Sequence, residues 1–368
     1  MKKHHIRYDE RHTMFSRARL KPGTKPYQDF YQTHPHLKKG DDALRGMDFM
    51  QNIRKSQTFK DTFLPLIDND DNLIKAYHKI TEEKPVSKQQ KPIDKTQIKA
   101  LLKSFGAVDS GIVRLQEHHY YSHHGGVNDV LNLDNYGHAI KARYRSAIVY
   151  LVSMDEKAMR RAPHFEEMLE TKNGYHAVAN IGTRLTLYLK ALGYPTLLQS
   201  EAFHLTPLVP LAYDSGMGEI GMSNHIIHPQ YGDRIRLGAV LTDLDLTPDQ
   251  PIDFGLEAFC AQCGLCLINC PNQAIKHKKR WVNNRQFYQF DEQSCFKMFK
   301  TSGTDCGVCI QSCPFSYHID AALIAKMKDD EKSIDHVIKN HLHHHGRRPR
   351  IKEPLDIVKG EKDHENKH

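Results

Sequence analysis

Eight cysteines are the residues of this chain whose spacing most directly indicates chemistry. They form two runs, and each run ends in a Cys-Pro pair: the first reads C-x2-C-x2-C-x3-C-P and the second reads C-x10-C-x2-C-x3-C-P. Short loops of this kind wrap three thiolates around one iron–sulfur cubane and carry the next cysteine toward a second cluster. The pattern is typical of electron-transfer proteins with two 4Fe-4S clusters.

The spacing divides the cysteines into two ligand sets, each with residues from both runs. Set A comprises Cys260, Cys263, Cys266 and Cys313. Set B comprises Cys270, Cys295, Cys306 and Cys309. Zinc ribbons also use CxxC pairs, but two Cys-Pro endings with no cysteine left over favour iron–sulfur clusters. Disulfides require an oxidising compartment, to which nothing in the sequence points.

Composition predicts a cytoplasmic protein without a membrane anchor. The N-terminus, MKKHHIRYDERHTMF, has no apolar core, paired arginines or small-residue cleavage site, so we expect no export signal. No apolar run approaches the ~18 residues of a membrane-spanning helix. The formal net charge is +8, with a pI near 8.9. The basic residues are spread along the chain without interleaved aromatics, so no nucleic-acid partner is expected.

Four stretches follow one another along the chain. Residues 1–90 are polar and predict an extended arm that wraps the rest, with one helix near residues 62–81. Residues 91–250 have the pattern of a compact α/β domain, and residues 251–320 form the two-cluster, ferredoxin-like part. Residues 321–368 predict a helix, which begins near residue 320 and runs to 339, and then a charged, histidine-rich mobile tail.

The α/β stretch must position whatever the clusters serve. We expect a helix at residues 95–105, strands at 111–115, 147–153 and 237–242, helices at about 155–170 and 175–192, and a linker at 245–253. The helix that begins at Tyr175 has one apolar face, made of Tyr175, Val178, Ala179, Gly182, Leu185 and Leu189. A domain of this size before two clusters indicates delivery of electrons to a catalytic cofactor.

Several collinear blocks resemble the corrinoid-dependent reductive dehalogenases, in a short form of cytoplasmic type without an export signal. The blocks cover most of residues 11–320 in order. They read RHTMFSRARLKPGTKPYQDFYQTHP, GYHAVANIGTRLTLYLKALGYPT, PLVPLAYDSGMGEIGMSNHIIHPQYGDRIRLGAVLTDLDL, PIDFGLEAFCAQCGLCLINCPNQAI and CFKMFKTSGTDCGVCIQSCPFSY. The resemblance implies an α+β fold: a nitroreductase-like α/β domain that binds base-off cobalamin, followed by a ferredoxin-like domain with two 4Fe-4S clusters.

The resemblance also implies a catalytic pair for reductive dehalogenation of an organohalide. The tyrosine that donates the proton in the family matches Tyr175, and the basic residue that assists it matches Arg234 in the segment GDRIR. The chemistry is sound, because a phenol with a pKa near 10 is a weak acid at neutral pH, and a guanidinium nearby favours its ionisation. From the residues alone, a hydrogen-bonded core tyrosine and a surface salt bridge remain open alternatives.

A glycine-rich segment matches the block that accommodates the corrinoid and its tail in the family. Glycines permit close backbone approach because they carry no Cβ. The predicted corrinoid contacts are Gly216, Gly218, Gly221, Tyr231 and Gly232. The chain departs from the family at Met222, where arginine is usual, and an ordinary glycine-rich turn is the alternative reading.

The histidines carry no such prediction. The family takes no histidine ligand to cobalt from the protein, so the 25 histidines are not evidence for a corrinoid. We expect residues such as His118, His119, His123 and His124 to be solvated or structural.

Two alternatives to dehalogenation remain. Epoxyqueuosine reductase, a tRNA-modifying relative, uses the same two cofactors, but it has a longer interval before its last cysteine group and an aspartate proton donor. Here that interval is ten residues, and Asp214 is not placed to replace Tyr175. The other alternative is a non-catalytic iron–sulfur carrier. Because no reductase domain is recognisable, the resemblance implies an external low-potential donor of ferredoxin or flavodoxin type, which the lysine-rich surface would attract.

Overall fold

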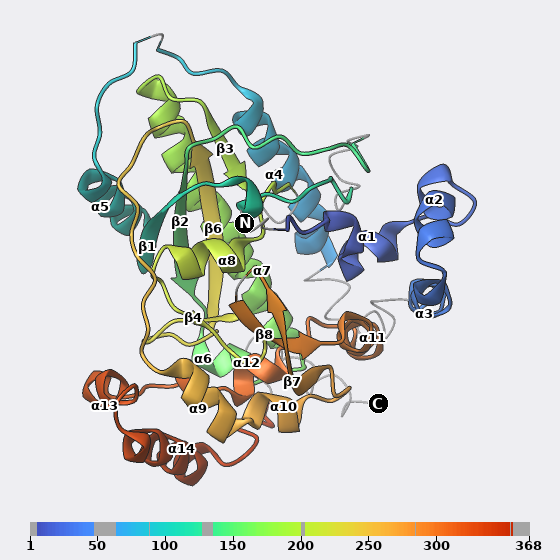
Figure 1. The fold of residues 1–368 in the computed structure, drawn as a ribbon, viewed down its shortest axis with the longest axis vertical. Helices are drawn as coiled ribbons and strands as arrows, with labels where there is room; N and C mark the ends of the chain where they lie inside the picture. The colour runs from blue at the N-terminus through green and yellow to red at the C-terminus, as the bar shows by residue number, and fades with distance from the viewer. Residues whose placement is uncertain are drawn as a thin grey trace, which may run out of the picture.

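The centre of the protein is a four-stranded antiparallel sheet with the strand order β1–β2–β6–β3 (Figure 1). The computed structural model describes residues 6–47, 64–87, 89–126, 135–199, 203–283, 285–353 and 355. The strands are β1 (Asp109–Arg114), β2 (Ser146–Ser153), β6 (Ile235–Thr242) and β3 (Thr196–Gln199). The two central strands pair along their whole length, from Ser146 opposite Thr242 to Ser153 opposite Ile235.

Apolar residues on alternate positions of the central strands build a core on each face of the sheet. On one face, Ile148 and Tyr150 pack with residues of α5 (Lys95–Phe105) and α7 (Phe165–Ala191). On the other, Val149 and Leu151 pack with α8 (Leu208–Asp214). With both faces covered, every residue of β2 before Ser153 is buried, which explains its continuous apolar run.

The predicted elements of the α/β domain are largely confirmed. The helix at residues 95–105 is α5, and a capping box between Asp94 and Gln97 begins it. The strands expected at 111–115, 147–153 and 237–242 are β1, β2 and β6, with starts shifted by at most two residues.

The helical boundaries at residues 155–192 were predicted wrongly. Only α6 (Glu156–Met159) is separate, and α7 is continuous through Tyr175, which therefore lies in the middle of a helix. Gly174 lies within α7, at the point where the helix comes close to β6. A Cβ at Gly174 would lie 2.7 Å from Cγ of Arg236.

The N-terminal arm is helical, which corrects the prediction of an extended segment. It contains η1 (Glu10–His12), α1 (Met14–Arg19), α2 (Lys25–Thr33), α3 (Pro35–Arg45) and α4 (Leu64–Glu82). Prolines in the first turns of α2 and α3 suit helix starts, and Tyr27, Phe30 and Tyr31 give α2 an apolar face. The helix predicted at 62–81 is α4, although residues 62 and 63 lie outside the described part. Figure 1 shows α1, α2 and α3 standing to one side of the sheet, near α11 (Glu292–Ser302).

The cysteine-rich part follows β6 and lies below the sheet in Figure 1. Its helices are α9 (Leu256–Cys263), α10 (Leu265–Asn269), α11, α12 (Val308–Ser312) and η5 (Pro314–Ser316). Strands β7 (Ile275–Val282) and β8 (Arg285–Phe290) form a hairpin between the two cysteine runs. The remaining short elements are β4 (Glu219–Ile220), β5 (Ile226–Ile227) and η4 (Glu117–His119).

The end of the chain corrects two further predictions. The single helix expected at 320–339 is divided into α13 (Ala321–Lys326) and α14 (Glu331–His345), because Asp330 caps a new helix start. The histidine-rich segment is not a tail but the last turn of α14, where His341 is buried. Beyond it, Ile351 donates a backbone hydrogen bond to Arg160. The charged residues 356–368 lie outside the described part. Across the described helices, none combines the length and the apolarity needed to cross a lipid bilayer.

Candidate electron-transfer and catalytic site

A cavity of about 890 Å³ lies between α7, the N-terminal arm and the cysteine-rich part. Its wall contains all four cysteines of set B, namely Cys270, Cys295, Cys306 and Cys309. Tyr175 of α7 lies on the same wall. The volume is near the upper end of the range for small-molecule sites, about 300–1,000 Å³. The fold therefore brings the predicted proton donor and one predicted cluster site to a common space.

The four cysteines of set A lie together around a separate small hollow of about 20 Å³. Cys260 and Cys263 come from α9, Cys266 from α10, and Cys313 follows α12. The grouping of cysteines in the two cavities matches the two sets read from the spacing.

An apolar cluster connects the two sets. Met222, Ile275 and Tyr288 are buried in it, and Cys260 and Cys266 of set A pack against it together with Cys270 and Cys309 of set B. Met222, at the position where the resemblance led us to expect arginine, is 1% exposed and so fills the interior between the cysteine sets. An arginine there would need a partner for a buried charge.

Burial dominates the state of the thiols. It raises the pKa of Cys260 and of Cys306 to about 12, and the backbone N–H groups of Met222 and Val308 act in the opposite direction. At Cys270 the sulfur accepts a hydrogen bond of 3.2 Å from the backbone N–H of Ala274. Without metal the thiols of Cys260 and Cys306 are protonated at neutral pH, so cluster assembly must displace their protons. Hydrogen bonds to sulfur also tune the reduction potential of a cluster.

Two cations approach the ring of Tyr175. The guanidinium carbon of Arg236 is 5.2 Å from the ring centroid, and Nζ of Lys172 is 5.9 Å from it. Arg236 is held by a hydrogen bond of 2.7 Å from its Nη2 to the hydroxyl of Thr171. All four of these residues line the large cavity, which places positive charge beside the phenol.

Glu167 supplies a buried carboxyl to the same wall. It is fully buried against the loop of set B: a Cβ at Gly307 would lie 2.5 Å from its Oε1. Burial, and then the carboxylate of Asp305, raise its pKa to about 8 against the opposing effects of Arg236 and the Thr171 hydroxyl. Near neutral pH, Glu167 is therefore largely protonated.

Among the described residues, the wall of the large cavity contains two buried polar atoms without a hydrogen-bond partner. These are Oε2 of Glu167 and Nε of Arg236. A buried polar atom that stays unpaired costs free energy, so such atoms mark a place where a ligand can supply partners. The volume, the thiols and these atoms fit a large cofactor with polar substituents.

Arg234 lies away from the cavity wall. Its Nε donates to the carbonyl of Ser316 at 3.1 Å, and its Nη1 donates to the carbonyl of Met154. Arg234 does not line the cavity that Tyr175 lines, whereas Arg236, two residues further along, lies beside the ring of Tyr175. The role of Arg234 stays a prediction.

The predicted corrinoid contacts also lie outside the lining of the large cavity. Gly216 has a φ of 76°, and a Cβ on it would lie 2.3 Å from the backbone carbonyl oxygen of Gln250. A Cβ on Gly218 would lie 2.3 Å from the backbone carbonyl oxygen of Ile227. Gly232, with φ of 61°, lies against Phe315. Contacts within the protein thus require these three glycines. Gly221 borders the set A hollow, and Tyr231 packs on the sheet core beside His228.

Arg236 and Glu167 were not predicted from the sequence. A signal for Arg236 existed, since GDRIR contains a second arginine at the two-residue spacing of a strand. For Glu167 there was none, because its burial depends on how α7 packs against the loop that contains Gly307.

The histidines named from the sequence contact other residues of the protein. His119 accepts the backbone N–H of Gln116 at Nδ1, so its Nε2 carries the proton and donates to Asp214 at 3.0 Å. Asp214 also forms an ion pair with Arg285. Although His118, His119 and Asp214 offer three ligand atoms close together, this bonding already uses His119 and Asp214. His123 and His124 form the bridge and backbone contacts of the neighbouring loop.

Comparison with known proteins identifies the cysteine-rich part of the chain. Residues 259–317, which include all eight cysteines, match the family model described as a 4Fe-4S dicluster domain. The tetrachloroethene reductive dehalogenase of Dehalobacter restrictus (strain DSM 9455 / PER-K23) is 29% identical over 197 residues, 49% of this chain and 35% of that protein. The corresponding enzyme of Sulfurospirillum multivorans is 29% identical over 179 residues, 46% of this chain and 35% of that protein. The chain thus matches about a third of the length of these curated relatives.

The chain is also similar to an epoxyqueuosine reductase in sequence and to reductive dehalogenases among the solved structures. The epoxyqueuosine reductase of Lactococcus garvieae (strain Lg2) is 28% identical over 129 residues, 33% of this chain and 35% of that protein. Among solved structures, the catabolic reductive dehalogenase NpRdhA in complex with 3-bromo-4-hydroxybenzoic acid is similar with a TM-score of 0.72 at 21% identity, covering 97% of this chain and 50% of that chain. A second reductive dehalogenase structure, whose title concerns B12-dependent dehalogenation, gives a TM-score of 0.65 at 24% identity over 78% of this chain and 44% of that chain. The predicted fold class is confirmed: this chain has the fold of the reductive dehalogenases, resembles them in sequence and carries a 4Fe-4S dicluster domain.

Proposed function

We propose that this chain is an oxidoreductase that removes a halogen from an organohalide. Sets A and B would each hold one 4Fe-4S cluster, and the cavity of about 890 Å³ would hold a base-off cobalamin and the substrate. The observation that carries this proposal is the common wall shared by Tyr175 and all four cysteines of set B. Reductive dehalogenation needs a source of electrons and a source of a proton, and this wall brings a candidate for each together.

The overall reaction replaces a carbon–halogen bond by a carbon–hydrogen bond. It consumes two electrons and one proton and releases the halide. When bound, the cobalamin supplies a strongly reduced cobalt that breaks the carbon–halogen bond. Set B, on the cavity wall, would hold the cluster nearer the substrate, and set A would hold the cluster on the far side of Met222.

Tyr175 would supply the proton. Its phenol faces a space bordered by Arg236 and Lys172, and their positive charge would stabilise the phenolate that remains after proton transfer. The geometry supports Arg236 for this assisting role, whereas the resemblance assigns it to Arg234. Substituting each arginine by lysine separates the two: the assisting residue is the one whose variant shifts the pH profile of halide release.

Apolar side chains on the cavity wall would exclude water from the reaction. They include Phe15 of α1, Phe165 and Met168 of α7, and Phe290, Phe296 and Phe299 of the cysteine-rich part. Low water content strengthens the electrostatic effect of the cations beside Tyr175.

The proposal is tested by loading the protein anaerobically and measuring metal content and halide release. Two 4Fe-4S clusters and one cobalamin correspond to about eight iron and about one cobalt per chain. Tyr175→Phe should retain the metals and release halide at least ~10²-fold more slowly, because general acid catalysis contributes about that factor. Halide release at the wild-type rate by this variant would contradict the role of Tyr175.

Epoxyqueuosine reduction is the second candidate, favoured by the match to the enzyme of Lactococcus garvieae. Incubating the reduced, loaded protein with a haloaromatic compound and with epoxyqueuosine-containing tRNA shows which one is converted. A chain that binds iron but no cobalt would instead act as an electron carrier. The electron donor in the proposed reaction is a separate low-potential protein of ferredoxin or flavodoxin type, and the proposed location is the cytoplasm.

A further inference from the structure

The β7–β8 hairpin concentrates positive charge next to set A. Its strands contain Lys276, Lys278, Lys279, Arg280 and Arg285 and no acidic residue. Two of these charges are neutralised locally, since Lys279 pairs with Glu257 at 2.5 Å and Arg285 pairs with Asp214. Lys276, Lys278 and Arg280 are exposed and form no ion pair with a carboxylate of the described residues, although Lys276 helps to lower the pKa of Asp291 and Arg280 opposes the burial that raises the pKa of Glu292.

The hairpin covers a second cavity, of about 400 Å³, that leads to a cysteine of set A. Trp281, Phe287 and Tyr288 of the hairpin line it together with Lys279 and Cys260. Tyr288 belongs at the same time to the apolar cluster against which Cys260 and Cys266 pack. A molecule that occupies this cavity therefore lies beside the site of the first cluster.

Neighbouring segments hold the hairpin in place. At its tip, Asn283 exchanges two hydrogen bonds with the backbone of Ile6, at 2.7 and 2.8 Å. On the inner side, Lys279 lies 4.9 Å from the ring centroid of Tyr288, and Arg285 lies 4.3 Å from that of Tyr213. A surface fixed before binding loses less conformational entropy when a partner docks.

We propose that the β7–β8 hairpin is the docking surface for an acidic protein that carries a single-electron redox group, and that the electron enters through the cavity beside Cys260. This inference rests on the proposed function, which requires an external donor. The exposed cations would steer an acidic partner by long-range attraction, and the cavity would receive the projecting edge of its redox group. The transfer moves one electron: the carrier is oxidised by one electron, the set A cluster is reduced by one, and no bond forms or breaks.

RNA is a weaker occupant for this surface. Single-stranded nucleic acid binds to a series of exposed aromatic rings between basic residues. Among the Phe, Tyr and Trp residues of the described hairpin only Trp281 is exposed, at 69%, whereas Tyr288 is buried and Phe287 is half-buried; His277 is the other exposed ring. Access to a cluster cysteine is also a feature that an electron carrier uses and an RNA does not.

The test compares two charge-reversal variants of the iron-loaded protein. One variant replaces Lys276, Lys278 and Arg280 by glutamate. The control replaces Lys84, Lys91 and Lys103 by glutamate, which alters the net charge equally at exposed positions near α5, away from the cysteine-rich part (Figure 1). Stopped-flow absorbance then follows cluster reduction by reduced flavodoxin, an acidic carrier, and separately by reduced methyl viologen, a small cation that gains nothing from a basic surface.

We expect the hairpin variant to lose at least about tenfold in the second-order rate constant with flavodoxin at low salt, within the range of electrostatic steering. The loss should disappear near 1 M salt, where charges are screened within about 3 Å. A variant with glutamine at the same three positions should lose less. Methyl viologen, a cation, should reduce both charge-reversal variants at least as fast as the wild type, which shows that the clusters are intact.

Equal flavodoxin rates for the hairpin and control variants would overturn the docking proposal and leave the proposed function standing. Binding of tRNA to the wild-type protein that only the hairpin variant loses would overturn it too, in favour of a nucleic-acid surface. A purified chain without iron would fail in the methyl viologen arm and overturn the proposed function, on which this inference rests.

Discussion

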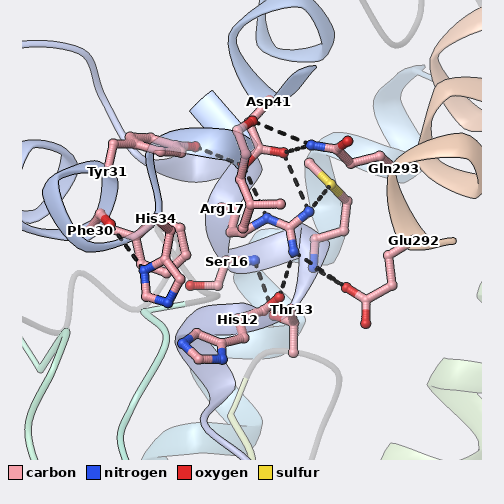
Figure 2. A network of polar contacts seen from close by, with 12 residues as sticks. His12, Thr13, Ser16, Arg17, Phe30, Tyr31, His34, Asp41, Glu292 and Gln293 are labelled. Carbon is pink, nitrogen blue, oxygen red and sulfur yellow. Dashed lines mark hydrogen bonds and ion pairs between the residues drawn. The ribbon is translucent and has the colours of Figure 1, made fainter. Parts of the chain in front are cut away.

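The buried ion pair between Arg17 of α1 and Asp41 of α3 is the centre of a network that also contacts α11, and its removal should loosen the connection between the N-terminal arm and the cysteine-rich part. Asp41 of α3 is fully buried and accepts hydrogen bonds from Arg17 Nε at 3.0 Å and from Tyr31 Oη at 3.0 Å. It also accepts one from Gln293 Nε2 of α11 at 2.8 Å. Figure 2 shows Arg17 between Asp41 and Glu292, so helices α1, α3 and α11 meet at this network.

The magnitude follows from burial. The side chain of Arg17 is 7% exposed, so after Asp41→Asn it has little water around it, and among the described residues it keeps only the more distant carboxylate of Glu292, at 3.7 Å and 38% exposed. Removing one partner of a buried pair costs about 3–5 kcal/mol. The cost should favour local separation of α1–α3 from α11, raising the opening equilibrium by roughly two to three and a half orders of magnitude. Since α11 carries Cys295 and α1 contributes Phe15 to the large cavity, cobalamin retention should fall as well.

Hydrogen exchange of the amides in α1–α3 and α11 measures this opening directly. The matched control is Asp42→Asn, one residue further on α3. Asp42 pairs with Lys38 and Arg45, but its side chain is 32% exposed, so solvent screening limits the expected loss to roughly 1 kcal/mol or less. Exchange in the sheet strands should be unchanged in both variants. If the two variants exchange equally in α1–α3, the argument from the buried charge is wrong.

Two further predictions concern stability. Glu167 has a pKa of about 8 in the folded protein and about 4.5 when unfolded, so between these values the folded state holds a proton that the unfolded state has lost. The free energy of unfolding should therefore fall as the pH rises from about 5 to 8. Glu167→Gln should reduce this fall in the free energy of unfolding by a few kcal/mol, as measured by denaturant titration at each pH. If the wild type and the variant lose stability equally with rising pH, the prediction is wrong. Gly232→Ala should prevent iron loading, because a Cβ would lie 2.4 Å from the backbone of Phe315. Gly264→Ala, also at positive φ but in open space, should cost only about 1 kcal/mol and load normally.

Local signals explain the parts of the fold that were predicted. The buried strand β2 is a continuous apolar run, and α5 begins at a capping box and ends at Gly106 in the left-handed region. The errors occurred where tertiary contacts override local preference. Gly174 stays inside α7 because β6 lies against it, and the polar N-terminal stretch folds into helices that pack against α11.

In the candidate site, too, some residues were predicted from the sequence and others were found only in the structure. Cysteine spacing predicted the two sets that the structure groups around separate cavities, because a short CxxC loop wraps one cubane while the cysteine of the following Cys-Pro pair is carried toward the other. Tyr175 was named by resemblance to a known family. The residues around it could not be read from the chain: Arg236 and Glu167 reach the cavity only because β6 and the Gly307 loop pack against α7. Spacing along the chain determines which thiols can share a metal cluster, whereas the charge beside a phenol depends on residues that only the packing of distant segments brings near.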